Sequence, residues 1–232
     1  SIRVGTPSGG SLAPEGGAHQ SFTTPSFGRE QPGGVAFEPA FAVEVTWCLL
    51  DGLGRLGRPD GSSTYLRLST APVDQSLAAV PTDPAARERR RRGVVGGGYL
   101  LRRADTRPRV TIAAVGATVP AAAAAADRLE ALGVPADVVV VTSADLLFRA
   151  MQGGEHRVLD AAFPADRAAP LVTVIDGHPH TLAFLAGVHR VHARHLGVTG
   201  FGQSSDLASA YAIHGIDADG IVTAALDGAE ST

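Results

Sequence analysis

Strand-length apolar runs alternate with helix-length segments through residues 94–232, and this alternation most constrains the fold of the chain. The apolar run at residues 138–141 can face helices on both sides, as strands of a covered parallel sheet do. The pattern therefore predicts an α/β domain with a mostly parallel sheet. The expected strands are residues 98–102, 109–115, 136–141, 171–175 and 195–199, and the expected helices are residues 120–132, 144–151, 182–190, 206–211 and 218–226.

Residues 1–75 contain only part of such a pattern. Residues 1–37 are rich in Gly, Pro, Ser and Thr, which predicts a strand stub followed by a long loop. Residues 39–56 predict a helix and residues 63–69 a strand, so this region corresponds to the back half of an α/β domain. Helical spacing places the buried stripe of that helix at Phe41, Val45, Cys48, Leu49 and Leu53.

A linker is expected at residues 76–93, which contain Pro81, Pro84 and a basic run at residues 87–92. The basic run fits either an anion-binding patch or a solvated linker, and the second is the commoner use of such runs. The chain thus divides into residues 1–75, 76–93 and 94–232.

The formal net charge of -3 gives no electrostatic case for binding nucleic acid or a membrane. No apolar run reaches the roughly 18 residues that span a bilayer, and no charged-then-apolar leader is visible. The single cysteine, Cys48, falls in an apolar helical pattern and is expected to be buried rather than nucleophilic. These observations favour a cytoplasmic location.

The segment at residues 14–21 (Pro-Glu-Gly-Gly-Ala-His-Gln-Ser) combines a carboxylate, Glu15, with an imidazole, His19. Gly16 and Gly17 disfavour a helix and allow a ligand to approach the backbone closely. A histidine titrates near neutral pH and can exchange protons with a bound intermediate. Spacing alone does not distinguish this arrangement from a surface loop with a solvated histidine.

A second polar segment, Asp176-Gly177-His178-Pro179-His180, follows an expected strand. Its place at the carboxyl end of the strand is where α/β sheets bind ligands. Asp and His are competent metal ligands, but no third His or Cys follows at metal spacing. We therefore expect no metal site.

Taken in order along the chain, these segments resemble the thiamine-diphosphate enzymes of the transketolase and homodimeric pyruvate dehydrogenase superfamily, with the dehydrogenase branch closest. Each match is short, and their order is the specific part. The resemblance implies a partial pyrimidine-binding domain followed by a complete transketolase C-terminal-like α/β domain. The matching segments are Glu15, Gly16, His19 and Gln20, then residues 38–40, 65–70, 74–75, 116–118, 132–134, 136–139, 196–198, 201–204 and 214–217.

The resemblance also implies a reaction and a set of site residues. The reaction is cleavage of a C–C bond next to a ketone, with transfer of a two-carbon unit to a lipoyl or carbonyl acceptor. By resemblance, His19 faces the reacting carbon and handles protons or orients the substrate, and Glu15 orients the substrate. Gln20 and Ser21 follow His19 directly and are expected to contact the substrate.

Part of the family's pattern is absent from the sequence. The Gly-Asp-Gly and downstream Asn that bind the diphosphate and metal do not occur, and the glutamate that activates the cofactor would precede Ser1. Thiamine diphosphate and Mg2+ would therefore be held mainly by a partner chain or a missing domain. The implied assembly is a homodimer or a hetero-oligomer with a diphosphate-binding subunit, and a lipoyl-bearing acyltransferase is a further candidate partner.

Two departures bear on the substrate. Sugar-phosphate transketolases carry a His-Asp pair, which residues 6–8 lack. They also carry an Arg at the position that Thr70 occupies in this sequence. A phosphate requires such charge-assisted donors, so a small 2-oxo acid is favoured, although Arg29 or Arg67 could substitute. The alternative is a non-catalytic assembly or docking module, or a proteolytic fragment of such an enzyme.

Overall fold

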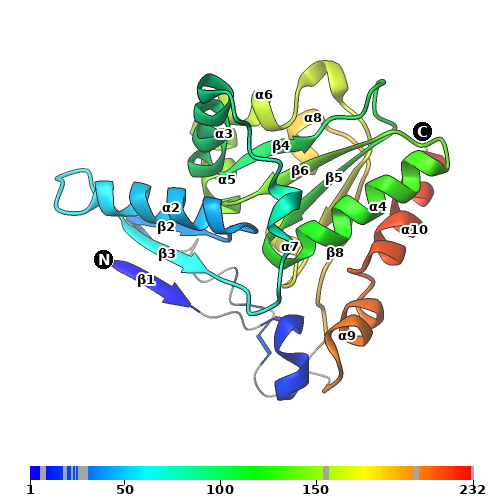
Figure 1. The fold of residues 1–232 in the computed structure, drawn as a ribbon, viewed down its shortest axis with the longest axis horizontal. Coiled ribbons are helices and arrows are strands. Elements are labelled where there is room, and N and C mark those ends of the chain that lie inside the picture. The colour runs from blue at the N-terminus through cyan, green and yellow to red at the C-terminus, as the bar shows by residue number, and fades with distance from the viewer. Residues whose placement is uncertain are drawn as a thin grey trace.

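The computed structural model describes residues 1–5, 9–17, 20–21, 23, 25, 31–153, 157–200 and 204–230, and it contains two β-sheets (Figure 1). The smaller sheet has strand order β1-β3-β2, and its neighbouring strands are parallel. The larger sheet has the order β4-β6-β5-β7-β8, in which only the β4–β6 pair is antiparallel. The predicted α/β class with a mostly parallel sheet is confirmed.

The larger sheet comprises β4 (Gly98–Arg102), β5 (Val110–Val115), β6 (Ala136–Val141), β7 (Leu171–Val174) and β8 (Ala193–Leu196). Alternate strand residues point to opposite faces, so Ile112 and Val138 enter one buried cluster, whereas Ala113 and Val139 enter the other. Burying each Val or Ile contributes roughly 1.5–3 kcal/mol. Helices α4 (Val119–Ala131) and α10 (Ala218–Glu230) cover the first face, and α5 (Ala144–Gly153), α6 (Arg157–Ala162), α7 (His180–Ala183) and α8 (Ala186–His189) lie toward the second.

The smaller sheet comprises β1 (Ile2–Gly5), β2 (Gly34–Phe37) and β3 (Ser63–Arg67), with helix α2 (Ala42–Arg55) packed on it. Phe37 and Leu66 extend the first buried cluster into this sheet, so one apolar core runs through both sheets. None of the helices in the described part of the chain is long and apolar enough to cross a membrane.

The expected buried stripe of α2 is partly wrong. Phe41 and Cys48 are buried, but Leu49 and Leu53 are 37% and 49% exposed. The buried face instead includes Glu44, whose carboxylate accepts hydrogen bonds from the Phe41 backbone N–H and the Tyr99 hydroxyl. A buried carboxylate needs such partners, so the orientation that satisfies Glu44 leaves the leucines outward.

The expected linker contains helix α3 (Pro84–Gly96), preceded by the 3-10 turn η3 (Gln75–Ala78). The Asp83 carboxylate accepts a hydrogen bond from the Ala86 N–H and so caps α3. The basic run lies on this helix, where the Arg87 guanidinium lies 5.5 Å from the Trp47 ring centroid and that of Arg90 lies 4.2 Å from the Tyr99 ring. Arg87 and Arg90 of the basic run thus help to pack α3 onto its neighbours.

Candidate functional site

The segment that ends at Glu15 forms a 3-10 turn, η1 (Gly10–Glu15), which packs against helix α9 (Leu207–Ile213). Figure 1 shows η1 as a short blue helix beside the orange α9, away from the smaller sheet. The Ser205 N–H donates to the Ala13 carbonyl (3.3 Å), and the Gly17 N–H donates to Ser204 Oγ (3.3 Å). The sequence assigns this turn to residues 1–75, but these hydrogen bonds hold it against residues 94–232.

The centre of this contact is Asp176, which follows β7 and is 2% exposed. Its carboxylate accepts hydrogen bonds from the Gly10 N–H (2.5 Å), the Ser11 N–H (3.0 Å) and the Tyr211 hydroxyl (3.1 Å). Burial and then the adjacent Asp176 charge raise the pKa of Tyr211, so this hydroxyl keeps its proton and remains a donor.

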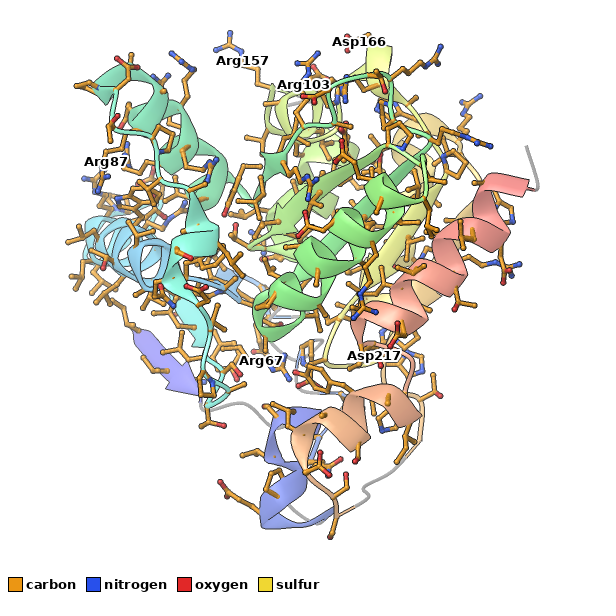
Figure 2. The ribbon with its side chains drawn as sticks, turned by 45° about the vertical axis from the view of Figure 1, so that its right-hand side comes forward. Arg67, Arg87, Arg103, Arg157, Asp166 and Asp217 are labelled. Atoms are coloured by element: carbon orange, nitrogen blue, oxygen red, sulfur yellow. The ribbon has the colours of Figure 1, made fainter. Side chains whose placement is uncertain are left out.

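The carboxyl ends of strands from both sheets meet beside Asp176. Arg67, at the end of β3, forms an ion pair with Glu38, which follows β2, and also donates to the Asp176 carbonyl (2.8 Å). Figure 2 shows Arg67 pointing from β3 into the region between the sheets. Gly116, after β5, has φ of 54°, and a Cβ there would lie 3.0 Å from Glu38 Cγ. Among the described residues, two small cavities of about 30 Å³ and 10 Å³ lie next to Glu38 and Arg67.

The predicted site residues have different environments. Glu15 ends η1 and is exposed, whereas Gln20 is 7% exposed and its N–H donates to the Gly17 carbonyl (3.2 Å). Ser21 is half-buried, with its Oγ 3.3 Å from Thr23 Oγ1. His19 lies outside the described residues. The structure thus places an exposed carboxylate close in the chain to two less exposed polar side chains.

The described residues contain no group of three or more His, Cys, Asp or Glu side chains that could hold a metal ion. The Nδ1 atoms of His178 and His180 lie 2.6 Å apart, at hydrogen-bonding distance. The Asp176 carboxylate accepts hydrogen bonds from the N–H groups of Gly10 and Ser11. The donor set in this part of the chain therefore does not fit the metal–diphosphate end of thiamine diphosphate.

Sequence reasoning missed the roles of Asp176, Tyr211 and Glu38. It considered Asp176 only as a metal ligand and Glu38 only as part of a segment that matches the family. The sequence does place Glu38 and Asp176 directly after apolar runs. Such a position predicts that the side chain lies at the carboxyl edge of a sheet, but it does not predict which residue the side chain contacts. Arg67 was a candidate phosphate donor, but it is 3% exposed and engaged with Glu38 and Asp176.

Comparison with known proteins matches the chain to one family and to a curated relative. The profile described as "Transketolase-like TK C-terminal domain" matches residues 97–217. Transketolase 2 of Xanthobacter flavus is 28% identical over 213 residues, which are 92% of this chain and 28% of that protein. This chain therefore spans under a third of that relative's length.

Solved structures share the fold. A transketolase mutant from Pichia stipitis has a TM-score of 0.77 at 18% identity, covering 99% of this chain and 30% of that one. Transketolase from Leishmania mexicana has a TM-score of 0.75 at 23% identity, covering 99% and 30%. A split-gene transketolase, solved as an inactive β4 tetramer, has a TM-score of 0.68 at 21% identity, covering 99% and 67%. The chain belongs to the transketolase-like C-terminal domain family, within the thiamine-diphosphate-dependent transketolase-like superfamily.

Proposed function

We propose that this chain supplies the substrate end of a thiamine-diphosphate-dependent enzyme that cleaves a C–C bond next to a ketone and transfers a two-carbon unit. The observation that carries the proposal is the exposed Glu15 carboxylate on a turn that the family's C-terminal domain holds through Asp176. A fixed turn that presents an exposed carboxylate is suited to orienting a ligand.

Thiamine diphosphate, when bound, supplies the electron sink for C–C cleavage, and the protein supplies orientation and proton transfer. In this division of labour, Glu15 orients the substrate and accepts a hydrogen bond from the substrate oxygen once that oxygen carries a proton. His19 donates or removes a proton at the substrate oxygen, which an imidazole can do near neutral pH. Gln20 and Ser21 supply neutral hydrogen-bonding groups beside them.

The diphosphate and Mg2+ belong, in this proposal, to a partner chain or a further domain. The absence of a metal-ligand cluster among the residues that the structure describes supports this division. The metal would require oxygen ligands at octahedral positions, which one exposed carboxylate such as Glu15 does not provide.

For the donor, we favour a small 2-oxo acid such as pyruvate, with a lipoyl or carbonyl acceptor. Arg67 is buried and forms an ion pair with Glu38, so it would have to break that pair to reach a phosphate. Breaking a buried pair costs about 3–5 kcal/mol, which disfavours Arg67 as a phosphate ligand. Arg29, the other candidate, lies outside the described residues.

The smaller sheet supports an assembly with a diphosphate-binding subunit, as a homodimer or a hetero-oligomer. Parallel sheets are normally covered on both faces, but β1 is an edge strand and Val4 is 60% exposed. Leu50 and Leu53 of α2 are 60% and 49% exposed. We propose that the subunit that completes this α/β unit covers these side chains. If the enzyme is a 2-oxo acid dehydrogenase, a lipoyl-bearing acyltransferase is a further partner. The single cysteine, Cys48, is buried and free, which favours a cytoplasmic location.

Reconstitution tests the proposal. The chain is mixed with a subunit that carries the Gly-Asp-Gly motif, and two-carbon transfer from pyruvate or from a ketose phosphate is measured with and without thiamine diphosphate and Mg2+. Cofactor-dependent turnover that requires both chains supports the proposal. A stable complex in which neither donor reacts at saturating cofactor would contradict it.

One observation favours a second function, that of a non-catalytic assembly module. The carboxyl edge of the larger sheet, where α/β domains bind ligands, is closed by Asp176 and by Glu38 and Arg67 of the smaller unit. A domain closed in this way can serve to hold its neighbour in place. The inactive complex described above is the outcome that this second function predicts.

A further inference from the structure

The turn that presents Glu15 is fixed mainly by one side chain of the other unit. Asp176 is the only described carboxylate that accepts hydrogen bonds from η1, and it binds the N–H groups of Gly10 and Ser11 together. Hydrogen bonds to a charged acceptor are roughly twice as strong as neutral ones. The hydrogen bonds that link Ser204 and Ser205 to this segment are single bonds of 3.3 Å between uncharged groups.

Close packing makes this arrangement sensitive to small changes. A Cβ on Gly9 would lie 2.7 Å from the Asp176 carbonyl oxygen, and one on Gly10 would lie 3.2 Å from the Tyr211 ring. Gly9 has φ of -91°, so it is the lack of a side chain rather than an unusual backbone that the contact requires. The turn can therefore reach Asp176 only because these two positions carry no side chain.

Asp176 also connects the turn to both sheets. Its carbonyl accepts the hydrogen bond from Arg67 of β3, and its carboxylate accepts the hydroxyl of Tyr211 from α9. With an exposed fraction of 2%, the carboxylate must keep protein partners to offset its lost hydration. If Asp176 is neutralised, the two backbone N–H groups of η1 and the Tyr211 hydroxyl lose their charged acceptor, whereas the hydrogen bond from Arg67 to the Asp176 carbonyl is retained.

We infer that Asp176 is a positioning residue: it fixes the turn Gly10–Glu15 on the C-terminal domain and thereby sets where the Glu15 carboxylate meets the substrate. The second part rests on the proposed function, whereas the anchoring of the turn does not. Asp176 acts through Glu15 and has no direct contact with substrate in this scheme.

Amide hydrogen exchange of Gly10 and Ser11, followed by NMR on the full chain, tests the anchoring without any activity. Asp176→Asn should speed their exchange by about tenfold to a hundredfold, as expected for loss of a charge-assisted hydrogen bond. The matched control is Asp137→Asn. Asp137 is also 2% exposed, and it binds Arg167 and the Ala104 N–H rather than η1. Equal exchange in the Asp176→Asn variant and the wild type would overturn the inference.

Gly9→Ala and Tyr211→Phe keep the test decisive if Asp176→Asn does not fold. Gly9→Ala should displace the turn and speed the same two amides. Gly54→Ala is its control, because nothing lies within 4 Å of a Cβ at Gly54. Tyr211→Phe removes one hydrogen bond from Asp176 and should give a smaller increase, about twofold to tenfold. Slow exchange at Gly10 and Ser11 in both variants would equally overturn the inference.

Turnover of the reconstituted enzyme tests the second part. Asp176→Asn should lower kcat in the enzyme that retains Glu15. It should have little further effect in the Glu15→Gln enzyme, because Asp176 acts through Glu15. Additive losses in the double variant would contradict the positioning role. If the amides respond as expected but Glu15→Gln leaves turnover unchanged, the anchoring stands and the role proposed for Glu15 fails.

Discussion

The Tyr99 hydroxyl donates a hydrogen bond to the Glu44 carboxylate, which joins β4 of the larger sheet to α2 of the smaller unit. Burial raises the pKa of Glu44 above its usual 4.5, although hydrogen bonds from Tyr99, Phe41 and Ala40 oppose the shift. A carboxyl group with a raised pKa in the folded state makes part of the stability of this junction depend on pH.

We predict that Glu44→Gln removes this pH dependence. Because the folded-state pKa is raised, the contribution of Glu44 is fully present below about pH 4.5 and is lost as the pH rises through the folded pKa. Glutamine mimics the protonated group at every pH. Urea unfolding at about pH 4.5 and pH 8 should therefore show the wild type losing stability relative to the variant as pH rises.

Glu88→Gln is the control for this prediction. Glu88 lies on α3 with 43% of its side chain exposed, and its hydrogen bond with Arg91 lowers its pKa, so its pH dependence has the opposite sign. A wild-type stability that stays constant relative to Glu44→Gln between the two pH values would contradict the account of Glu44.

The pair of Arg67 and Glu38 should matter more than a surface pair. Arg67→Met removes the Arg67 guanidinium from the Glu38 carboxylate in a mostly buried site and should lower the free energy of unfolding by about 3–5 kcal/mol. Arg102→Met removes a more exposed cation from Asp127 and Glu130 and should cost at most about 1 kcal/mol. Chemical denaturation of both variants checks this. Similar losses would show that the junction between the sheets does not depend on Arg67.

The exposed leucines of α2 should affect assembly and not folding. Leu50→Lys changes a side chain that is 60% exposed, so the unfolding free energy of the chain should stay within about 0.5 kcal/mol. Binding to a diphosphate-binding subunit, measured by sedimentation, should weaken at least tenfold. Leu132→Lys, at a residue 62% exposed after α4, should leave binding unchanged. Equal binding of both variants would exclude α2 as the covered face.

The sequence predicted regular elements well where one periodic pattern dominated. The strands of the larger sheet were expected within a few residues, and at the starts of two expected helices Asp206 and Asp217 accept hydrogen bonds from the N–H groups of Ser209 and Gly220. Local chemistry determines both features, since apolar periodicity and capping act over a few residues.

Features set by distant contacts were not predictable. The burial of Glu44 rather than Leu53 depends on Tyr99, which lies 55 residues from Glu44. Asp176 meets Gly10 across 166 residues, and no local pattern records that pairing. Helix α3 was also missed, because its run of arginines lacks the apolar periodicity that marks a helix. The assignment of Glu15, His19, Gln20 and Ser21 to the site stays a prediction.

The most direct test of the central claim is the turnover of a His19→Ala variant in the reconstituted enzyme at saturating thiamine diphosphate. If His19 moves a proton at the substrate, kcat should fall by about 10²–10⁴-fold. The urea midpoint of the chain should stay unchanged, which separates a chemical role from a structural one. Unchanged turnover in an enzyme that depends on both chains and on the cofactor would contradict the claim that this chain supplies the reacting side chains.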